Sequence, residues 1–149
     1  MGCPLCDRLK SPDPAPLVRI AAFRQSTAFL NDQQGCAGWC VLVLNRHVEH
    51  LDELPEEAQV ALFAEVSGVA RAIRAVHATT GAGGGPPRIN YECLGNQTAH
   101  VHWHVIPRHA DDPEPRKPVW GWPEERLAGS MTRAERVALA AKIRGALPR

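Results

Sequence analysis

Residues 95–108 read GNQTAHVHWHVIPR, and this stretch dominates the interpretation of the whole chain. Its three histidines, at 100, 102 and 104, alternate with apolar residues, which is the two-residue period of a β-strand. We therefore predict a strand over 100–106, closed by Pro107 because proline cannot extend a central strand. The imidazoles would share one face of that strand, and the apolar side chains of the other face would pack into a core.

Short apolar segments elsewhere predict four more strands, and one longer segment predicts a helix. The strands are expected at 17–23, 27–30, 39–44 and 88–91. The helix is expected over 54–79, with Pro55 in its first turn and apolar residues at three- and four-residue spacing. The glycine run at 81–85 lacks the pattern of a phosphate-binding loop, so we interpret it as a flexible connector.

The C-terminal region differs in composition from the rest of the chain. Residues 110–126 are rich in proline, charge and tryptophan, and they are expected to run over the surface. Thr132-x-x-Glu135 resembles a capping box that opens a last helix, ending near Leu147. Because the strands are not separated by regular helices, the pattern favours an α+β fold over a doubly wound parallel sheet. We expect about five antiparallel strands, one long helix and a C-terminal helix.

Length and composition exclude several classes of protein. A chain of 149 residues predicts a single domain over 1–149. A formal net charge of +1 gives no global field for a nucleic-acid polymer or a membrane, and no apolar stretch approaches the ~18 residues that span a bilayer. The five cysteines are an odd number without a secretory leader, which argues against a disulfide framework. A reducing cytoplasm is therefore the expected location.

The alternating histidines suit chemistry at phosphorus. Near neutral pH much of an imidazole is unprotonated, so one nitrogen is a nucleophile while the other carries a proton that an acceptor can fix. Attack on a phosphoryl centre would give a covalent phospho-histidine and split one hard step into two. Two other interpretations are a half-buried strand with a polar face and a site that only binds metal.

The histidine run and its surroundings resemble the histidine triad (HIT) family. The family signature is three histidines separated by apolar residues, preceded by a Gln-Ser/Thr loop, here Gln97-Thr98. Upstream, FLND at 29–32 and VLVLNRHVE at 41–49 are similar to two family strands. The resemblance covers about residues 3–109, leaves 110–149 as an extension, and is nearest to bacterial proteins related to diadenosine polyphosphate hydrolases. It implies hydrolysis or transfer at the α-phosphate of a nucleotide, with dinucleoside polyphosphates or nucleoside phosphoramidates as substrates.

The resemblance also implies a role for individual residues. His102 matches the nucleophile, the backbone carbonyl of His104 would orient its ring, and the His104 side chain would lie near the phosphate. The neutral groups that would hold the phosphate and the nucleotide are Asn96, Gln97, Thr98 and Asn90. The family's ribose-binding aspartate aligns with Asn31, while Asp32 stands one place later, so either residue could contact the ribose.

Cys3-x-x-Cys6 has the spacing of a metal-binding pair, which needs two further ligands. From the sequence, the candidates for those ligands are His47, His50, His77, His100 and His109. The resemblance implies a structural zinc on Cys3, Cys6, His47 and His100, with His50 as the alternative to His47. A redox pair and two free thiols are the other interpretations. The redox pair requires the motif to open a helix after a strand, and here it precedes every predicted strand.

The tail and the assembly leave several hypotheses open. Trp120 and Trp122 could stack on a base, cover the active site, contact a partner subunit or pack on their own chain. Members of the family are usually homodimers, so the resemblance implies a homodimer here. Three functions compete: a nucleotide hydrolase or transferase, a nucleotide-binding regulatory module with little turnover, and a zinc-organised interaction domain. The third leaves His102 and His104 unexplained.

Overall fold

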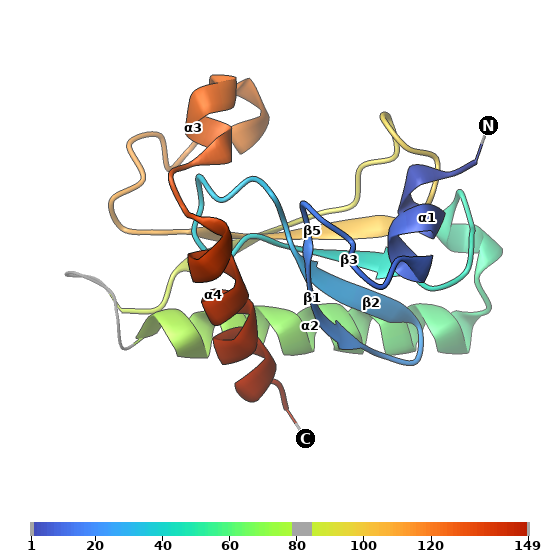
Figure 1. Cartoon of the computed structure of the whole chain (residues 1–149). Helices are drawn as coiled ribbons and strands as arrows, with labels where there is room; N and C mark the ends of the chain where they lie inside the picture. The colour runs from blue at the N-terminus through green and yellow to red at the C-terminus, as the bar shows by residue number, and fades with distance from the viewer. Residues whose placement is uncertain (1, 79–84, 149) are drawn as a thin grey trace.

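The computed structural model describes residues 2–78 and 85–148, and their framework is one antiparallel sheet (Figure 1). The strand order is β1-β2-β3-β5-β4, and every neighbouring pair is antiparallel. The strands are β1 Val18–Ala22, β2 Ser26–Leu30, β3 Cys40–Leu44, β4 Arg88–Glu92 and β5 His102–Arg108. The predicted α+β class with a five-stranded antiparallel sheet is confirmed.

Helices lie on both faces of this sheet (Figure 1). They are α1 Pro4–Lys10, η1 Leu51–Glu53, α2 Glu56–Ala78, η2 Val119–Gly121, α3 Glu124–Ala128 and α4 Arg133–Gly145. Of the predicted stripe of α2, Leu62, Val66, Val69 and Ile73 are buried and Val76 is half-buried. Val69 and Ile73 share a core cluster with Leu42 and Val105 of the sheet. The short helix α1 lies on the opposite face, where Leu5 packs with the cluster of β2 and β3 side chains.

Strand β5 begins and ends later than the sequence predicts. His100 precedes the strand, and its backbone N–H bonds to the Thr98 carbonyl in a turn. Pro107 lies inside the strand, opposite Ile89 of β4. The prediction that Pro107 closes β5 is wrong because β3 pairs only as far as Val105, so the proline occupies a part of β5 with β4 alone beside it.

Residues 110–126 do not simply run over the surface. Val119 is fully buried and Trp122 is nearly so, and both join a cluster with Trp39, Ile106 and Cys36. The indole of Trp122 also lies under the Arg126 guanidinium, 3.6 Å from its ring centroid. The polar composition of residues 110–126 gave no sign of these two buried apolar residues, which pack the segment against the sheet.

The N-terminal helix α1 was not predicted, although its signals are in the sequence. Cys3 is the N-cap residue, Pro4 follows at the first position, and Arg8 and Lys10 lie in the last turn, where they complement the helix dipole. The predicted helix end at Thr79 and most of the predicted connector, 81–84, lie outside the described residues. Within residues 2–78 and 85–148, no helix combines the length and apolar character needed to cross a membrane.

Candidate active site and metal centre

His102 opens β5 and is held by the chain just before the strand. Its Nδ1 lies 2.7 Å from the backbone carbonyl oxygen of His100, and the residue is buried. The resemblance implied the carbonyl of His104 instead, and that expectation is wrong. His100 precedes β5, so its carbonyl lies outside the sheet ladder and accepts from the ring.

This contact fixes the position of the proton on the neutral His102 ring. A carbonyl oxygen only accepts hydrogen bonds, so Nδ1 carries the proton and donates it. The other nitrogen, Nε2, then keeps its lone pair. Because His102 lines a cavity of about 580 Å³, its ring offers an unprotonated nitrogen to anything bound there.

His104 follows His102 on the same face of β5, with ring centroids 5.2 Å apart. The indole Nε1 of Trp39 lies 3.1 Å from His104 Nδ1 and donates to it. Burial, with a smaller effect of neighbouring His102, lowers the pKa of His104 to about 4. His104 is therefore a neutral imidazole across the neutral pH range.

The cavity beside His102 is lined by residues from segments that are far apart in the sequence. Its lining is Leu5, Leu17, Asn31, Asp32, Gln33, Val41, Leu94, Asn96, Gln97, Thr98, His102, His104 and Trp120. Every residue predicted for catalysis or substrate binding is in this set except Asn90. That residue pairs with Ile106 and lines a separate pocket with Arg108 and His109.

Asn31 and Asp32 both line the cavity, but they differ in what they can offer. Asn31 is buried, and both polar groups of its backbone are hydrogen-bonded. Its N–H donates to the backbone carbonyl of Trp39, and its carbonyl accepts from the side-chain amide of Gln34. Asp32 is exposed and bonds through one carboxylate oxygen to the backbone N–H of Gln33. The carboxylate of Asp32 is therefore the more accessible acceptor.

The two tryptophans of the tail have different environments. Trp122 packs on its own chain, as described above. Trp120 is 38% exposed, lines the cavity, and sets its ring edge-on to His104 with centroids 5.0 Å apart. Its indole N–H donates to Glu92 of β4, the residue paired with His104. Sequence reasoning left the role of Trp120 open, because only the fold brings residue 120 to this strand.

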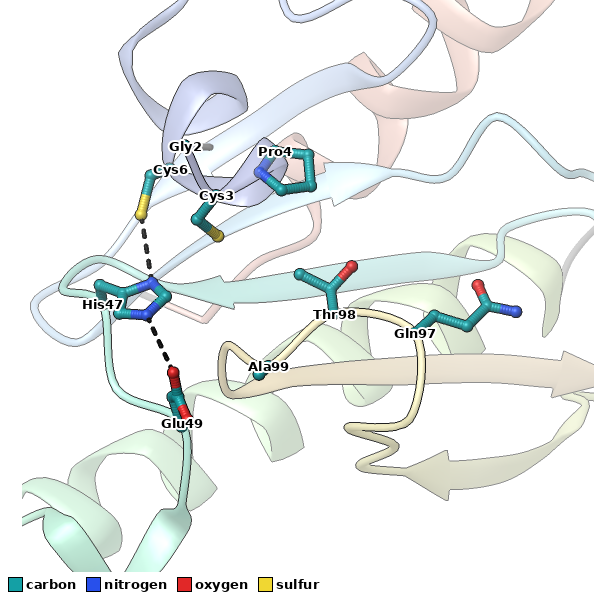
Figure 2. Close-up of a pocket in the computed structure, with 9 residues that line it drawn as sticks. All are labelled: Gly2, Cys3, Pro4, Cys6, His47, Glu49, Gln97, Thr98 and Ala99. Carbon is teal, nitrogen blue, oxygen red and sulfur yellow. Dashed lines mark hydrogen bonds and ion pairs between the residues drawn. The ribbon is translucent and has the colours of Figure 1, made fainter.

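A second cluster lies where α1 meets the chain before β5. One ligand atom from each of Cys3, Cys6, His47 and His100 lies within 4.8 Å of the other three. His100 Nδ1 is 3.3 Å from Cys3 Sγ and 3.6 Å from Cys6 Sγ. Figure 2 shows the contact of His47 with Cys6, in which His47 Nδ1 is 3.5 Å from Cys6 Sγ. These four residues are positioned to bind a metal ion.

The separations fit a tetrahedral ion of zinc's size. Zn–S bonds of ~2.3 Å and Zn–N bonds of ~2.0 Å at tetrahedral angles place sulfur and nitrogen about 3.5 Å apart. Both histidines also have partners on their outer nitrogens, as metal-bound histidines usually do. His100 Nε2 lies 2.8 Å from the Leu44 carbonyl. His47 Nε2 lies 3.7 Å from the Glu49 carboxylate, a contact that Figure 2 shows. Within residues 2–78 and 85–148, the cluster includes His47 and not His50.

The chain matches the model of the HIT domain over residues 15–111. It belongs to the histidine triad family. The protein named "Protein hit" from Bacillus subtilis is 28% identical over 130 residues, and the match covers 77% of this chain and 88% of that protein.

Solved HIT structures have the same fold. A histidine triad protein from Sinorhizobium meliloti is 27% identical with a TM-score of 0.73, covering 88% of this chain and 90% of that one. One from Marinobacter aquaeolei is 25% identical with a TM-score of 0.72, covering 89% and 90%. A zinc-bound histidine triad family protein from Mycobacterium smegmatis is 21% identical with a TM-score of 0.61, covering 94% of each chain. At that identity the last likeness shows the fold alone.

Proposed function

We propose that this HIT protein hydrolyses or transfers nucleotidyl groups, with His102 as the nucleophile that attacks the α-phosphate. The observation that carries the proposal is the 2.7 Å contact from His102 Nδ1 to the His100 carbonyl. It leaves the Nε2 lone pair for the substrate, on a residue that lines a cavity with neutral amide and hydroxyl groups. Family membership supports the same chemistry.

The reaction proceeds in two displacements. The Nε2 lone pair of His102 attacks the α-phosphorus, a P–N bond forms, and the bond from phosphorus to the leaving group breaks. The leaving group departs with the bonding electron pair and takes a proton from solvent, while Nδ1 of His102 keeps its own. Water then attacks the same phosphorus, the P–N bond breaks, and a nucleoside monophosphate leaves while the proton of the water passes to solvent. In a transfer reaction, another nucleophile takes the place of water.

The cavity suits a nucleotide whose phosphate must leave again. Asn96, Gln97 and Thr98 supply neutral donors, which can bind phosphate oxygens without a strong ion pair that would slow release. Asp32 has a carboxylate that can accept from both ribose hydroxyls. We propose dinucleoside polyphosphates or nucleoside phosphoramidates as substrates, in which the leaving group is a nucleotide phosphate or an amine.

Turnover of both substrate classes, in wild type and His102→Asn, tests the proposal. His109→Asn is the control, because His109 lies in the pocket with Asn90 rather than in the cavity. Wild type and the control should release nucleoside monophosphate, while His102→Asn should be at least a thousandfold slower, since removal of a nucleophile costs several orders of magnitude. Equal turnover in His102→Asn contradicts the mechanism. Tight nucleotide binding without turnover in wild type favours the alternative, a regulatory module.

We further propose that Cys3, Cys6, His47 and His100 hold one zinc ion with a structural role. Four protein ligands would close a tetrahedral site and leave no position for substrate. Their segments, the start of α1, the chain after β3 and the chain before β5, are distant in sequence, so the ion would fasten the N-terminal helix to the catalytic strand. Two thiolates and two imidazoles are a donor set typical of structural zinc sites, which supports the choice of metal.

Metal analysis of the purified protein tests this site. We expect one equivalent of zinc in wild type and a large loss in Cys3→Ser. Cys93→Ser is the control, because Cys93 is exposed and lies outside the cluster. Full zinc content in Cys3→Ser, or none in wild type purified with zinc present, would overturn the assignment.

A homodimer is the proposed assembly. In the described chain, β4 ends the sheet and pairs only with β5, which leaves its other edge free for a second copy. Tyr91 on β4 is 52% exposed, so an apolar ring lies on that edge strand. Light scattering should give twice the mass of 16.3 kDa for wild type and for Val137→Lys on α4, but a monomer for Tyr91→Lys.

Two broader expectations belong to the same proposal. We propose that residues 1–149 fold as one domain, with the extension 110–149 packed on the core. The free cysteines, two of which belong to the metal cluster, are compatible with a reducing cytoplasm. Limited proteolysis of the purified protein tests the single domain, for which we expect one resistant fragment of nearly full length.

A further inference from the structure

Trp39 makes a contact that determines what His104 can do. The indole N–H is a donor and has no acceptor, so the nitrogen it faces must present a lone pair. That nitrogen is His104 Nδ1, 3.1 Å away. In the neutral ring the proton must then be on Nε2. The nitrogen left for the cavity is consequently a hydrogen-bond donor.

The indole of Trp39 is held rigidly enough to impose this arrangement. It is fully buried among Cys36, Ile106, Val119 and Trp122. Its backbone carbonyl accepts from Asn31 and Gln34, and its backbone N–H donates to Cys36. Because both the ring and the backbone are fixed, the indole cannot turn to accommodate another tautomer of His104.

The turn before Trp39 and the ring of Trp120 also restrict the space around His104. Gly38 has a φ of +96°, a backbone conformation that residues with a side chain rarely adopt. The resulting bend in the backbone directs the chain into β3, which begins just after Trp39. Trp120 lies edge-on to both rings, with centroids 5.4 Å from Trp39 and 5.0 Å from His104. His104 is therefore confined between two indoles, with the nucleophile on its third side.

We propose that Trp39 is a positioning residue that holds His104 in the neutral Nε2–H tautomer, so that His104 donates a hydrogen bond to the reacting phosphate. The proposal rests on the nucleotidyl-transfer function given above. A neutral donor stabilises the charge that develops on phosphate oxygens, and it avoids the strong ion pair that would retain the product. Trp39 itself does not contact the substrate.

The surroundings of His104 agree with a ring that stays neutral. A second proton would have to sit on Nδ1, where it would face the indole N–H. Burial disfavours the charged ring independently, and the pKa of His104 is lowered to about 4. Among the described residues, titratable neighbours of His104 include His102 on its own strand and Glu92, its partner on β4, whose carboxylate accepts a hydrogen bond from Trp120.

Nitrogen-15 NMR of the histidine rings in the resting protein tests the tautomer directly. In wild type, His104 should show a protonated Nε2 and an unprotonated Nδ1. Trp39→Phe should move proton population to Nδ1 and lower kcat about tenfold, the value of one lost hydrogen bond. Trp122→Phe is the matched control, because it alters the same cluster but its Nε1 has no hydrogen-bond partner. It should leave the tautomer and kcat unchanged.

A second measurement covers the case in which Trp39→Phe does not fold. In His104→Asn, the indole N–H resonance of Trp39 should shift, while that of Trp122 should not. A protonated Nδ1 on His104 in wild type, or an unchanged tautomer in folded Trp39→Phe, would overturn the proposal. Because both spectra are recorded without substrate, they remain decisive even if the nucleotidyl-transfer function fails its own test.

Discussion

His102 donates from Nδ1 to the backbone carbonyl of His100, at 2.7 Å. The side chain of His100 lies 3.3 Å from the sulfur of Cys3. His100 therefore links the two sites. Its backbone carbonyl orients His102, and its side chain belongs to the metal cluster.

This shared residue predicts that metal removal weakens both stability and catalysis. A chelator should lower the free energy of unfolding of wild type by about 4 kcal/mol relative to protein with zinc at a thousandfold excess over Kd. The chelator should also lower kcat, because removal of the metal ion frees the His100 side chain, and the backbone of His100 orients His102. Chemical denaturation and turnover with and without chelator measure the two effects. In Cys3→Ser the chelator should change neither, and an undiminished effect there would contradict the site.

The ribose contact is predicted to come from Asp32 rather than Asn31. Asp32→Ala should raise KM about tenfold with little change in kcat, because the carboxylate binds substrate and transition state alike. Asn31 is buried and held through its backbone, so Asn31→Ala should mainly lower stability. Steady-state kinetics of both variants decide between them. A tenfold rise of KM in Asn31→Ala alone would assign the ribose to Asn31.

The two tail tryptophans are predicted to separate into a site residue and a core residue. Trp120→Ala should alter KM or kcat severalfold while the unfolding midpoint changes little, because the ring is partly exposed beside His104. Trp122→Ala should cost about 3–5 kcal/mol of stability, as is typical for truncating a buried aromatic residue. Thermal unfolding and kinetics of both variants check this. Loss of stability in Trp120→Ala and not in Trp122→Ala would reverse the assignment.

Acid is predicted to destabilise the fold through His77. Burial, with smaller effects of His109 and Lys142, lowers the pKa of His77 to about 4. In the unfolded chain, His77 binds a proton near pH 6.5, so the unfolded state gains stability from protonation before the folded state does. The contribution of neutral His77 to the stability of the fold is therefore complete above pH 6.5 and is lost as the pH falls toward 4.

His77→Gln should therefore lose less stability between pH 7 and pH 5 than wild type, by on the order of 1 kcal/mol given the partial exposure of the ring. Urea denaturation at the two pH values measures the difference. His50→Gln, an exposed histidine, is the control and should behave as wild type. An identical pH dependence in wild type and His77→Gln would exclude the role of His77.

The sequence allowed the fold class and most of the site to be predicted, because those features depend on local patterns. Alternation at 100–105 identifies the face of β5, and helical spacing identifies the buried stripe of α2. The metal cluster was found by resemblance, and the structure brings Cys3, Cys6, His47 and His100 together.

Features that depend on distant contacts could not be predicted. The position of Pro107 inside β5 depends on where β3 stops pairing, which no local pattern reveals. Trp39 and His104 are far apart in the sequence, and only the antiparallel pairing of β3 with β5 brings them together. The carbonyl that orients His102 likewise depends on His100 lying outside the strand.

The most direct test of the central claim is mass spectrometry of the protein after brief reaction with a dinucleoside polyphosphate or a nucleoside phosphoramidate. The reaction is stopped in base, because a phosphorus–nitrogen bond to histidine is labile in acid. We predict a nucleoside monophosphate adduct on His102, present also in His109→Asn and absent from His102→Asn. Consumption of substrate with no adduct on His102, or with the adduct on another residue, would contradict the account.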